Sequence, residues 1–152
     1  MPAVRNDGPR VYVRRAAGTA QLCPTALARR AVQATIMRAS PHVRGDVTVV
    51  VTNDRAIRGL NRRYRGIDRA TDVLSFDIGD GRTVGEPFGD VVISVETARR
   101  QAREYGAPLK AELLRLLVHG ALHLCGYDHR EQREAARMHG LTRKLVSELL
   151  SA

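Results

Sequence analysis

The sequence predicts an α+β domain in which a small mixed sheet of about four strands packs with about five helices. Three observations indicate this fold class. Short β-branched or alternating segments are interleaved with longer segments of helical periodicity, no repeat or linker interrupts the chain, and one helix near the C-terminus is apolar nearly all round. Because the chain has 152 residues, one domain covering residues 1–152 is long enough to bury a hydrophobic core.

Two strands and two helices are expected in the first part of the chain. Apolar and charged residues alternate in residues 10–15, as in a half-buried strand, and the apolar spacing of residues 24–38 predicts a helix. The β-branched run at residues 46–52 predicts a strand covered on both faces. Asn53 is expected to cap a second helix that ends in a turn at Gly66 and has an apolar side formed by Ile57, Leu60 and Tyr64.

Two further strands are predicted at residues 73–76 and 90–95. The glycine-rich connection between them, residues 78–89, is short enough for an antiparallel pairing. A polar helix is expected over residues 97–105, and Gly106 ends it.

The last two predicted helices differ in their surroundings. Residues 111–125 are apolar on nearly every side, which predicts a helix at the centre of the fold, and Gly126 is expected to end it. A final amphipathic helix is predicted from about residue 131 to residue 150.

The composition indicates a compartment and a class of partner. The formal net charge of +9 favours a polyanionic partner such as nucleic acid, although lysine occurs only twice and the base composition of a genome explains an arginine bias equally well. Cys23 and Cys125 are expected to be small buried side chains in a reducing compartment. Residues 1–15 lack the apolar run of a signal peptide, and no stretch of about 18 apolar residues is present. These features predict a cytoplasmic protein without a membrane span.

The apolar helix carries the strongest functional signal. His119 and His123 are four residues apart, so their imidazoles lie about 40° apart around the helix axis and about 6 Å apart along it, within reach of one ion. Gly126 can end the helix in a left-handed conformation and turn the chain back, so that His129 reaches the same ion. Three imidazoles leave a fourth coordination position open, which is typical of catalytic zinc. The sequence therefore predicts one zinc ion per chain.

Two other interpretations of the histidines have less support. A single histidine on an apolar helix is usually a hydrogen-bonded core residue, but three of the five histidines fall within eleven residues here. His42 and His139 lack such neighbours and are expected to be ordinary surface or capping residues. The spacing also matches the HExxHxxGxxH pattern of metzincin proteases, except that Gly120 replaces the glutamate that acts as general base. A peptidase is therefore only a minor alternative.

Three segments resemble motifs of a known family. HGALHLCGYDH (119–129), LNRRYRGIDRATDVLSF (60–76) and GDVVIS (89–94) resemble the corresponding segments of the YbeY family, bacterial endoribonucleases of ribosomal RNA maturation. The resemblance implies a zinc-dependent, single-strand-specific endoribonuclease that acts in 16S ribosomal RNA 3′-end maturation and in ribosome quality control. By position it implies that His119, His123 and His129 bind the metal and that Arg65 takes part in catalysis.

The residues around Arg65 have weaker signals. Hydrolysis of a phosphodiester builds negative charge on the phosphoryl oxygens, and the Arg65 guanidinium is suited to stabilise it, whereas the plain alternative is a solvated arginine. Arg62 and Arg63 are expected to contact the phosphate backbone. Tyr64 and Tyr127 are suited to stack on unpaired bases, although helical spacing favours a core position for Tyr64.

The predicted strand at residues 73–76 is expected at the sheet edge beside the histidine helix, where it forms a wall of the cleft and places Ser75 against the substrate. Asp72 and Asp128 have two open interpretations, because each is suited either to orient a ligand histidine or to cap a turn. The sequence does not indicate which residue acts as general base.

The expected partners follow from the resemblance. They are RNA, in the form of the 16S ribosomal RNA precursor and the small ribosomal subunit, together with ribosomal proteins and the GTPase Era. A non-catalytic ribosome-assembly factor with a structural metal is the main alternative function.

Overall fold

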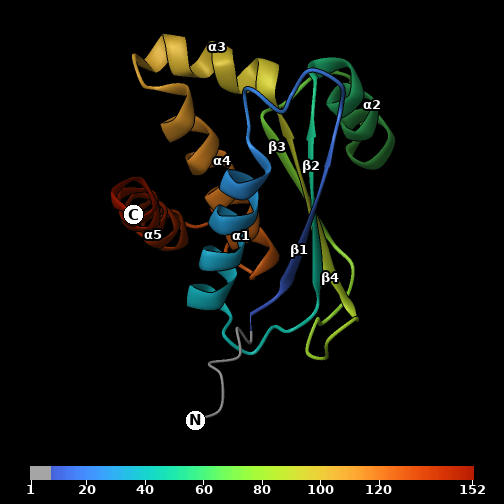
Figure 1. The fold of residues 1–152 in the computed structure, drawn as a ribbon, viewed down its shortest axis with the longest axis vertical. Coiled ribbons are helices and arrows are strands. Elements are labelled where there is room, and N and C mark those ends of the chain that lie inside the picture. Colours follow the sequence, from blue (N-terminus) through green and yellow to red (C-terminus); the bar gives the residue numbers. More distant parts are fainter. Residues whose placement is uncertain (1–7) are drawn as a thin grey trace.

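The computed structural model describes residues 8–152 and has the predicted architecture, a four-stranded mixed sheet with five helices. Helices α1 and α4 lie against one face of the sheet, α5 packs on the outer side of α4, and α2 lies against the opposite face (Figure 1). The first seven residues of the predicted domain, and with them part of the segment expected to lack a signal peptide, lie outside the described residues. No helix of the described part is long and apolar enough to cross a membrane.

The sheet has the order β1-β2-β4-β3. Strands β1 (Arg10–Arg15), β2 (Asp46–Thr52) and β4 (Pro87–Ser94) are parallel, and each is joined to its neighbour through helical segments. Strand β3 (Val73–Asp77) pairs antiparallel with β4, as predicted, because the connection between them is too short for a parallel crossover. The TDVLSF segment therefore lies at the sheet edge, and β3 contacts α4 there.

The five helices begin and end within two residues of the predicted positions. Asn53 caps α2, since its side chain accepts a hydrogen bond of 3.0 Å from the Ala56 amide. Both Gly66 and Gly106 adopt left-handed conformations after the helices that they end. The helices are α1 (Thr25–Ala39), α2 (Asp54–Arg65), α3 (Val95–Tyr105), α4 (Leu109–Leu124) and α5 (Gln132–Ser151).

Two hydrophobic clusters hold these layers together. The larger cluster fills the space between the sheet and the helices α1 and α4, and α4 is buried on most sides, as its sequence predicts. A much smaller cluster, built on Ile57, Leu74 and Val92, lies under α2. Helix α2 is thus attached to the fold by less apolar surface than α4.

Two burial predictions need correction. Strand β2 is covered on both faces only toward its C-terminal end, because α2 spans part of the outer face and leaves Thr48 half-exposed. Cys23 is fully buried as expected, but Cys125 is only half-buried because it follows the last turn of α4. Burial raises the pKa of both thiols, to about 11 in Cys23.

Candidate metal centre

Helix α4 places two of the three predicted ligands side by side. The Nε2 atoms of His119 and His123 lie 3.1 Å apart, because the two residues are separated by one helical turn and point to the same side of α4. Both rings are half-buried, between the sheet edge and the solvent.

The third histidine is brought back by the way α4 ends. Gly126 has a φ of 92°, its amide donates to the His123 carbonyl oxygen at 3.0 Å, and the Tyr127 amide donates to the Leu122 carbonyl oxygen at 3.1 Å. This pair of hydrogen bonds is the Schellman motif, which reverses the chain at a helix end. His129 returns to the other two rings, with ring centroids 5.3 Å from His123 and 6.0 Å from His119.

The three side chains fit a divalent metal. One nitrogen from each ring lies within 4.8 Å of the others. Tetrahedral zinc bonded to imidazoles at about 2.0–2.1 Å requires nitrogens about 3.3 Å apart, which the pair on α4 already meets. His129 is exposed, so rotation of its ring can close the remaining difference.

The protonation states also suit metal binding. Burial, together with the neighbouring His123 ring, lowers the pKa of His119 to about 4 from an ordinary value of 6.5. Burial and then His129 lower the pKa of His123, while Asp128 and a hydrogen bond with the Tyr127 backbone act in the opposite direction. Neutral imidazole is the form that binds a metal, so both rings on α4 are ready as ligands near neutral pH.

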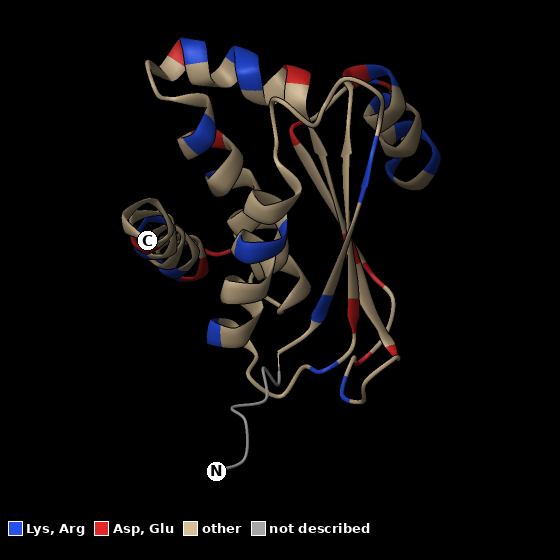
Figure 2. Ribbon diagram, viewed as in Figure 1, with Lys and Arg blue, Asp and Glu red and all other residues tan. Residues whose placement is uncertain are grey.

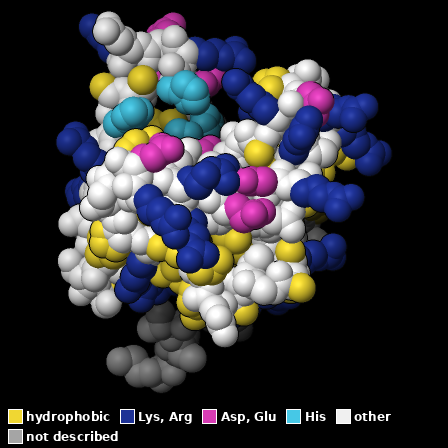
Figure 3. Space-filling view, turned by 90° about the horizontal axis from the view of Figure 1, so that it is seen from above, with side chains coloured by type: hydrophobic (Ala, Val, Ile, Leu, Met, Phe, Trp, Pro, Cys, Tyr) yellow, Lys and Arg dark blue, Asp and Glu magenta, His cyan; other side chains and the backbone are white. Residues whose placement is uncertain are grey.

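A cavity of about 740 Å³ lies in front of the histidines, and Arg65 contributes to its wall. In the space-filling view the histidine side chains gather at the rim of a hollow, and basic side chains stand nearby (Figure 3). Arg65 is the last residue of α2, is exposed, and forms no ion pair with any described residue. Its positive charge contributes to the low pKa of His123. The structure thus brings to one cavity the three imidazoles and an arginine that forms no ion pair with a described residue.

Of the other residues expected to bind substrate, the structure places some at this cavity and some outside it. Tyr127 and Ser75 line the cavity, although the Ser75 hydroxyl also donates to the Gly120 carbonyl oxygen at 2.8 Å and so ties β3 to α4. Arg62 and Arg63 are exposed on α2 outside this cavity. They belong to the basic last turn of α2, a helix that carries several Lys or Arg positions along its length (Figure 2).

Tyr64 departs from the predicted core position. It is 58% exposed, its ring meets the edge of Phe76 at a centroid distance of 5.3 Å, and the Arg63 guanidinium lies over it at 5.3 Å. The small cluster under α2 is centred on Ile57, so a residue seven positions later reaches only the rim of the sheet. Tyr64 does not line the cavity at the histidines.

The two aspartates act on the backbone. Asp72 Oδ1 accepts from the Val73 amide at 2.8 Å at the start of β3, and Asp128 Oδ1 accepts from the His129 amide at 2.7 Å. Neither carboxylate accepts a hydrogen bond from a histidine ring in the described structure. Both line the cavity, and Asp128 fixes the turn that carries His129. Each carboxylate also acts on a histidine through its charge, since Asp72 opposes the lowering of the His119 pKa and Asp128 that of the His123 pKa, so both interpretations stay open.

Gly120 packs directly against the sheet. A Cβ atom at this position would lie 2.7 Å from Val91 Cγ1 and 2.9 Å from Val73 Cγ2. This is the position at which a metzincin carries its general base, and here the side-chain direction is filled by two β-branched residues of the sheet. A glutamate has no room there, so the general base of a metzincin cannot stand at this position.

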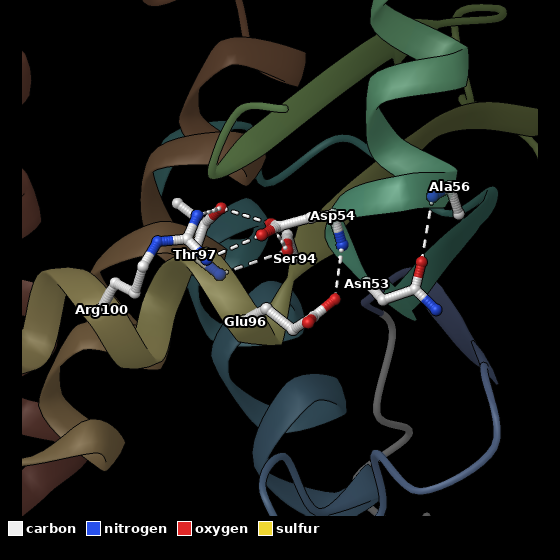
Figure 4. A network of polar contacts seen from close by, with 7 residues as sticks. All are labelled: Asn53, Asp54, Ala56, Ser94, Glu96, Thr97 and Arg100. Atoms are coloured by element: carbon white, nitrogen blue, oxygen red, sulfur yellow. Dashed lines mark hydrogen bonds and ion pairs between the residues drawn. The ribbon is translucent and has the colours of Figure 1, made fainter. Parts of the chain in front are cut away.

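Helix α2, which carries Arg65, is anchored at its other end by a polar network that the sequence did not indicate (Figure 4). Asp54 Oδ1 accepts from the Ser94 and Thr97 hydroxyls at 2.6 Å each, and Asp54 Oδ2 pairs with Arg100 at 2.7 Å. The Asp54 amide in turn donates to Glu96 at 2.9 Å. These bonds lower the pKa of Asp54 against the effect of burial, and they join the start of α2 to the start of α3.

A second unpredicted cluster lies one turn before His119 on α4. Glu112 is only 3% exposed, and the Arg115 guanidinium holds its carboxylate through Nε, at 3.1 Å, and Nη2. Arg115 also lies 3.9 Å from Asp72, and the Gln101 amide, in the orientation that satisfies its neighbours, donates to Glu112 at 3.0 Å. The signal in the sequence was the spacing of Arg115, which is four residues before His119 and therefore on the same side of the helix.

Three imidazoles at a helix end, beside a cavity that is also lined by an arginine without an ion-pair partner among the described residues, form a candidate metal site on an α+β fold. The chain belongs to the endoribonuclease YbeY family, whose profile matches residues 19–150.

Several proteins named endoribonuclease YbeY are similar to this chain. The relative from Myxococcus xanthus is 51% identical over 106 residues, which are 68% of this chain and 36% of that protein. Those from Heliobacterium modesticaldum and Rhizobium meliloti are each 46% identical over 112 residues, covering 66% and 72% of this chain and 68% and 67% of theirs. The chain thus spans about a third of the first relative and about two thirds of the others.

A solved structure has the same fold. The solution structure of a protein from Thermotoga maritima superposes with a TM-score of 0.65 at 27% identity, covering 94% of this chain and 89% of that chain. The likeness therefore extends over the whole domain and includes the elements that carry the histidines.

Proposed function

We propose that this chain is a zinc-dependent, single-strand-specific endoribonuclease that acts in 16S ribosomal RNA 3′-end maturation and ribosome quality control. The observation that carries the proposal is the shared cavity, in which His119, His123 and His129 face an arginine without an acidic partner, Arg65. Family membership supports the RNA substrate.

The three imidazoles would hold one zinc ion. When bound, zinc supplies an open coordination position and Lewis acidity toward water and phosphoryl oxygens. The low pKa values of His119 and His123 keep those rings unprotonated, and Asp128 holds the turn that presents His129.

Arg65 would act on the phosphate. Its guanidinium can donate two parallel hydrogen bonds to the phosphoryl oxygens, on which negative charge increases in the transition state. Because no described carboxylate neutralises it, its full charge is available to the substrate. Tyr127 on the cavity wall is placed to contact an unpaired base, and Arg62 and Arg63 extend the positive surface along α2 for the backbone.

The proposed substrate is the 16S ribosomal RNA precursor on the small ribosomal subunit, in the cytoplasm. Ribosomal proteins and the GTPase Era are the proposed protein partners. The net charge of +9 supports binding to this polyanion.

The test compares wild type with Arg65→Ala on a single-stranded RNA that carries the 3′ region of the 16S precursor, with a base-paired version as second substrate. We expect Zn²⁺-dependent cutting of the single strand only, slowed by about 100- to 1,000-fold in Arg65→Ala. Arg55→Ala, at the start of the same helix and also exposed, is the matched control and should cut as wild type does.

Three results would overturn the proposal. Intact RNA after incubation with folded, zinc-loaded wild type that still binds it would favour the assembly-factor alternative. Equal cutting by wild type and Arg65→Ala would indicate a contaminating nuclease. Cutting that persists after chelation and dialysis would contradict the metal requirement.

A further inference from the structure

A second and larger cavity adjoins the metal centre. It has a volume of about 1010 Å³ and lies between α4 and α5, reaching the turn between α3 and α4. His119 lines both this groove and the cavity that contains Arg65. The two spaces therefore meet at a metal-site histidine, and a strand held at the histidines can continue into the groove.

The lining of the α4–α5 groove suits a flat, largely apolar group. Ala111 on α4 and Val146 and Leu150 on α5 contribute apolar surface, and Tyr105 stands at the edge with 64% of its surface exposed. An exposed aromatic ring beside an apolar trough is the kind of surface on which unpaired bases stack, independently of their sequence. The volume is also in the range of sites that enclose a small organic molecule.

The charges in the groove favour an anion. Among the side chains that line the groove, the negative charge of buried Glu112 is matched by Arg115, whose Nη1 donates to no described residue. Asp72, which lies 3.9 Å from Arg115, lines the cavity at the histidines and not the groove. Arg143 on α5 is exposed and forms no ion pair within residues 8–152. The groove thus contains one neutralised ion pair, Glu112 with Arg115, and guanidinium N–H groups of Arg115 and Arg143 that are free to donate. These donors suit a phosphate-linked ligand better than an apolar peptide.

We propose that the α4–α5 groove binds the nucleotides of single-stranded RNA next to the phosphodiester at the histidines. A base lies against Tyr105 and the apolar side chains, and Arg143 holds a backbone phosphate. The inference rests on the proposed function, because it places the RNA from Arg65 across the histidines and into the groove. It adds a binding site that extends the substrate contact beyond the metal centre.

The experiment measures binding as well as cleavage. The purified full chain, with and without Zn²⁺, is titrated into a fluorescein-labelled single-stranded RNA, and the anisotropy is read before products appear. We expect Tyr105→Ala to weaken binding about tenfold, the cost of losing one base stack. We expect Arg143→Gln to weaken binding and to reduce the salt dependence by about one phosphate contact.

The controls are matched in residue type and exposure. Tyr12→Ala removes an exposed tyrosine from β1, and Arg133→Gln removes an exposed arginine from the start of α5 outside the groove. Both controls should bind RNA as wild type does. All four changed side chains are exposed, so circular dichroism should show folded proteins in each case.

The possible results separate the two proposals. Normal binding by both groove variants, alongside weakened binding by Arg65→Ala, would overturn the groove inference and leave the proposed function intact; a protein partner would then become its expected occupant. An absence of RNA binding by wild type would overturn both. Loss of binding by the groove variants and by the two controls alike would show general electrostatics and would also contradict a site in the groove.

Discussion

Gly120 on α4 lies so close to Val91 on β4 that a Cβ atom at Gly120 would stand 2.7 Å from the Val91 Cγ1 atom. We expect Gly120→Ala to lower the free energy of unfolding by about 1–3 kcal/mol, because the β-branched neighbours in the sheet cannot move aside. Urea unfolding followed by circular dichroism measures the effect. Gly140→Ala on α5 meets no atom within 4 Å and should instead be stabilising by about 0.5–1 kcal/mol. Equal effects at the two glycines would contradict this close packing.

Metal content should depend on each of the three clustered histidines. We expect His119→Ala, His123→Ala and His129→Ala to lower zinc affinity by at least about 100-fold, because a direct ligand contributes more than the outer partners that cost 10- to 100-fold. Metal analysis after dialysis against a weak chelator measures the loss. His139→Ala, an exposed histidine on α5, is the control. Full zinc content in His129→Ala would show that the turn after α4 does not complete the site.

The metal-free protein should lose stability as the pH falls from about 6.5 toward about 4. The folded-state pKa of His119 is lowered from 6.5 to about 4, and that of His123 is lowered as well. Below pH 6.5 the unfolded chain therefore binds protons that the folded chain excludes, and the free energy of unfolding declines. Urea midpoints across this range measure the decline in wild type, and His119→Gln should show a smaller one. A decline of the same size in both proteins would contradict the assignment to His119.

The network at the start of α2 should stabilise the fold and preserve cleavage. We expect Asp54→Ala to cost about 2 kcal/mol, since three hydroxyl or guanidinium donors lose a charged acceptor. Asp68→Ala, which removes an exposed ion pair to Arg58 near the other end of the same helix, should cost less than about 1 kcal/mol.

Cleavage rates separate a positioning effect of Asp54 from a general loss of stability. If Asp54 acts by holding α2, the Asp54→Ala change should slow wild type but add little to Arg65→Ala under conditions where both are folded. Additive slowing in the double variant would contradict that link.

The buried carboxylate of Glu112 should depend on its arginine. We expect Arg115→Met to destabilise the chain by about 3 kcal/mol, because Glu112 is 3% exposed and would lose its partner. The double variant Glu112→Leu with Arg115→Met should recover most of this loss. Chemical denaturation of the three proteins measures both effects, and a double variant as unstable as the single one would show that packing dominates.

Much of the fold could be predicted because its elements have strong periodicity. Helix and strand positions follow from apolar spacing and from end signals such as Asn53. The start of β4 was placed three residues late, since Pro87 and Gly89 are typical of a loop. The structure gives the actual reason for the glycine. A Cβ atom at Gly89 would lie 2.5 Å from the Leu124 side chain, so only glycine allows α4 to pack this closely on β4.

Local sequence patterns also predict only part of the candidate site. The grouping of its histidines was predictable because helix geometry places His119 and His123 together and the helix end at Gly126 turns the chain back toward them. Arg65 required a resemblance, since nothing local distinguishes it from its neighbours. The bonds of Asp54 to Ser94 and Thr97 join residues about forty positions apart, and no local pattern reports such a pairing. The predicted core position of Tyr64 is wrong because periodicity shows on which side of a helix a residue lies, but not how far the sheet beneath that helix extends.

The small cluster under α2 has a consequence for motion. The histidines belong to α4, which packs in the main core, and to the turn that follows it. Arg65 belongs to α2, whose one buried apolar side chain, Ile57, joins the small cluster and whose start is held by the hydrogen bonds of Asp54. Regions with few buried contacts open at lower free energy than the core. Hydrogen exchange should therefore be faster in α2 than in α4, and the arginine can swing away for RNA to enter or leave while the metal ligands stay together.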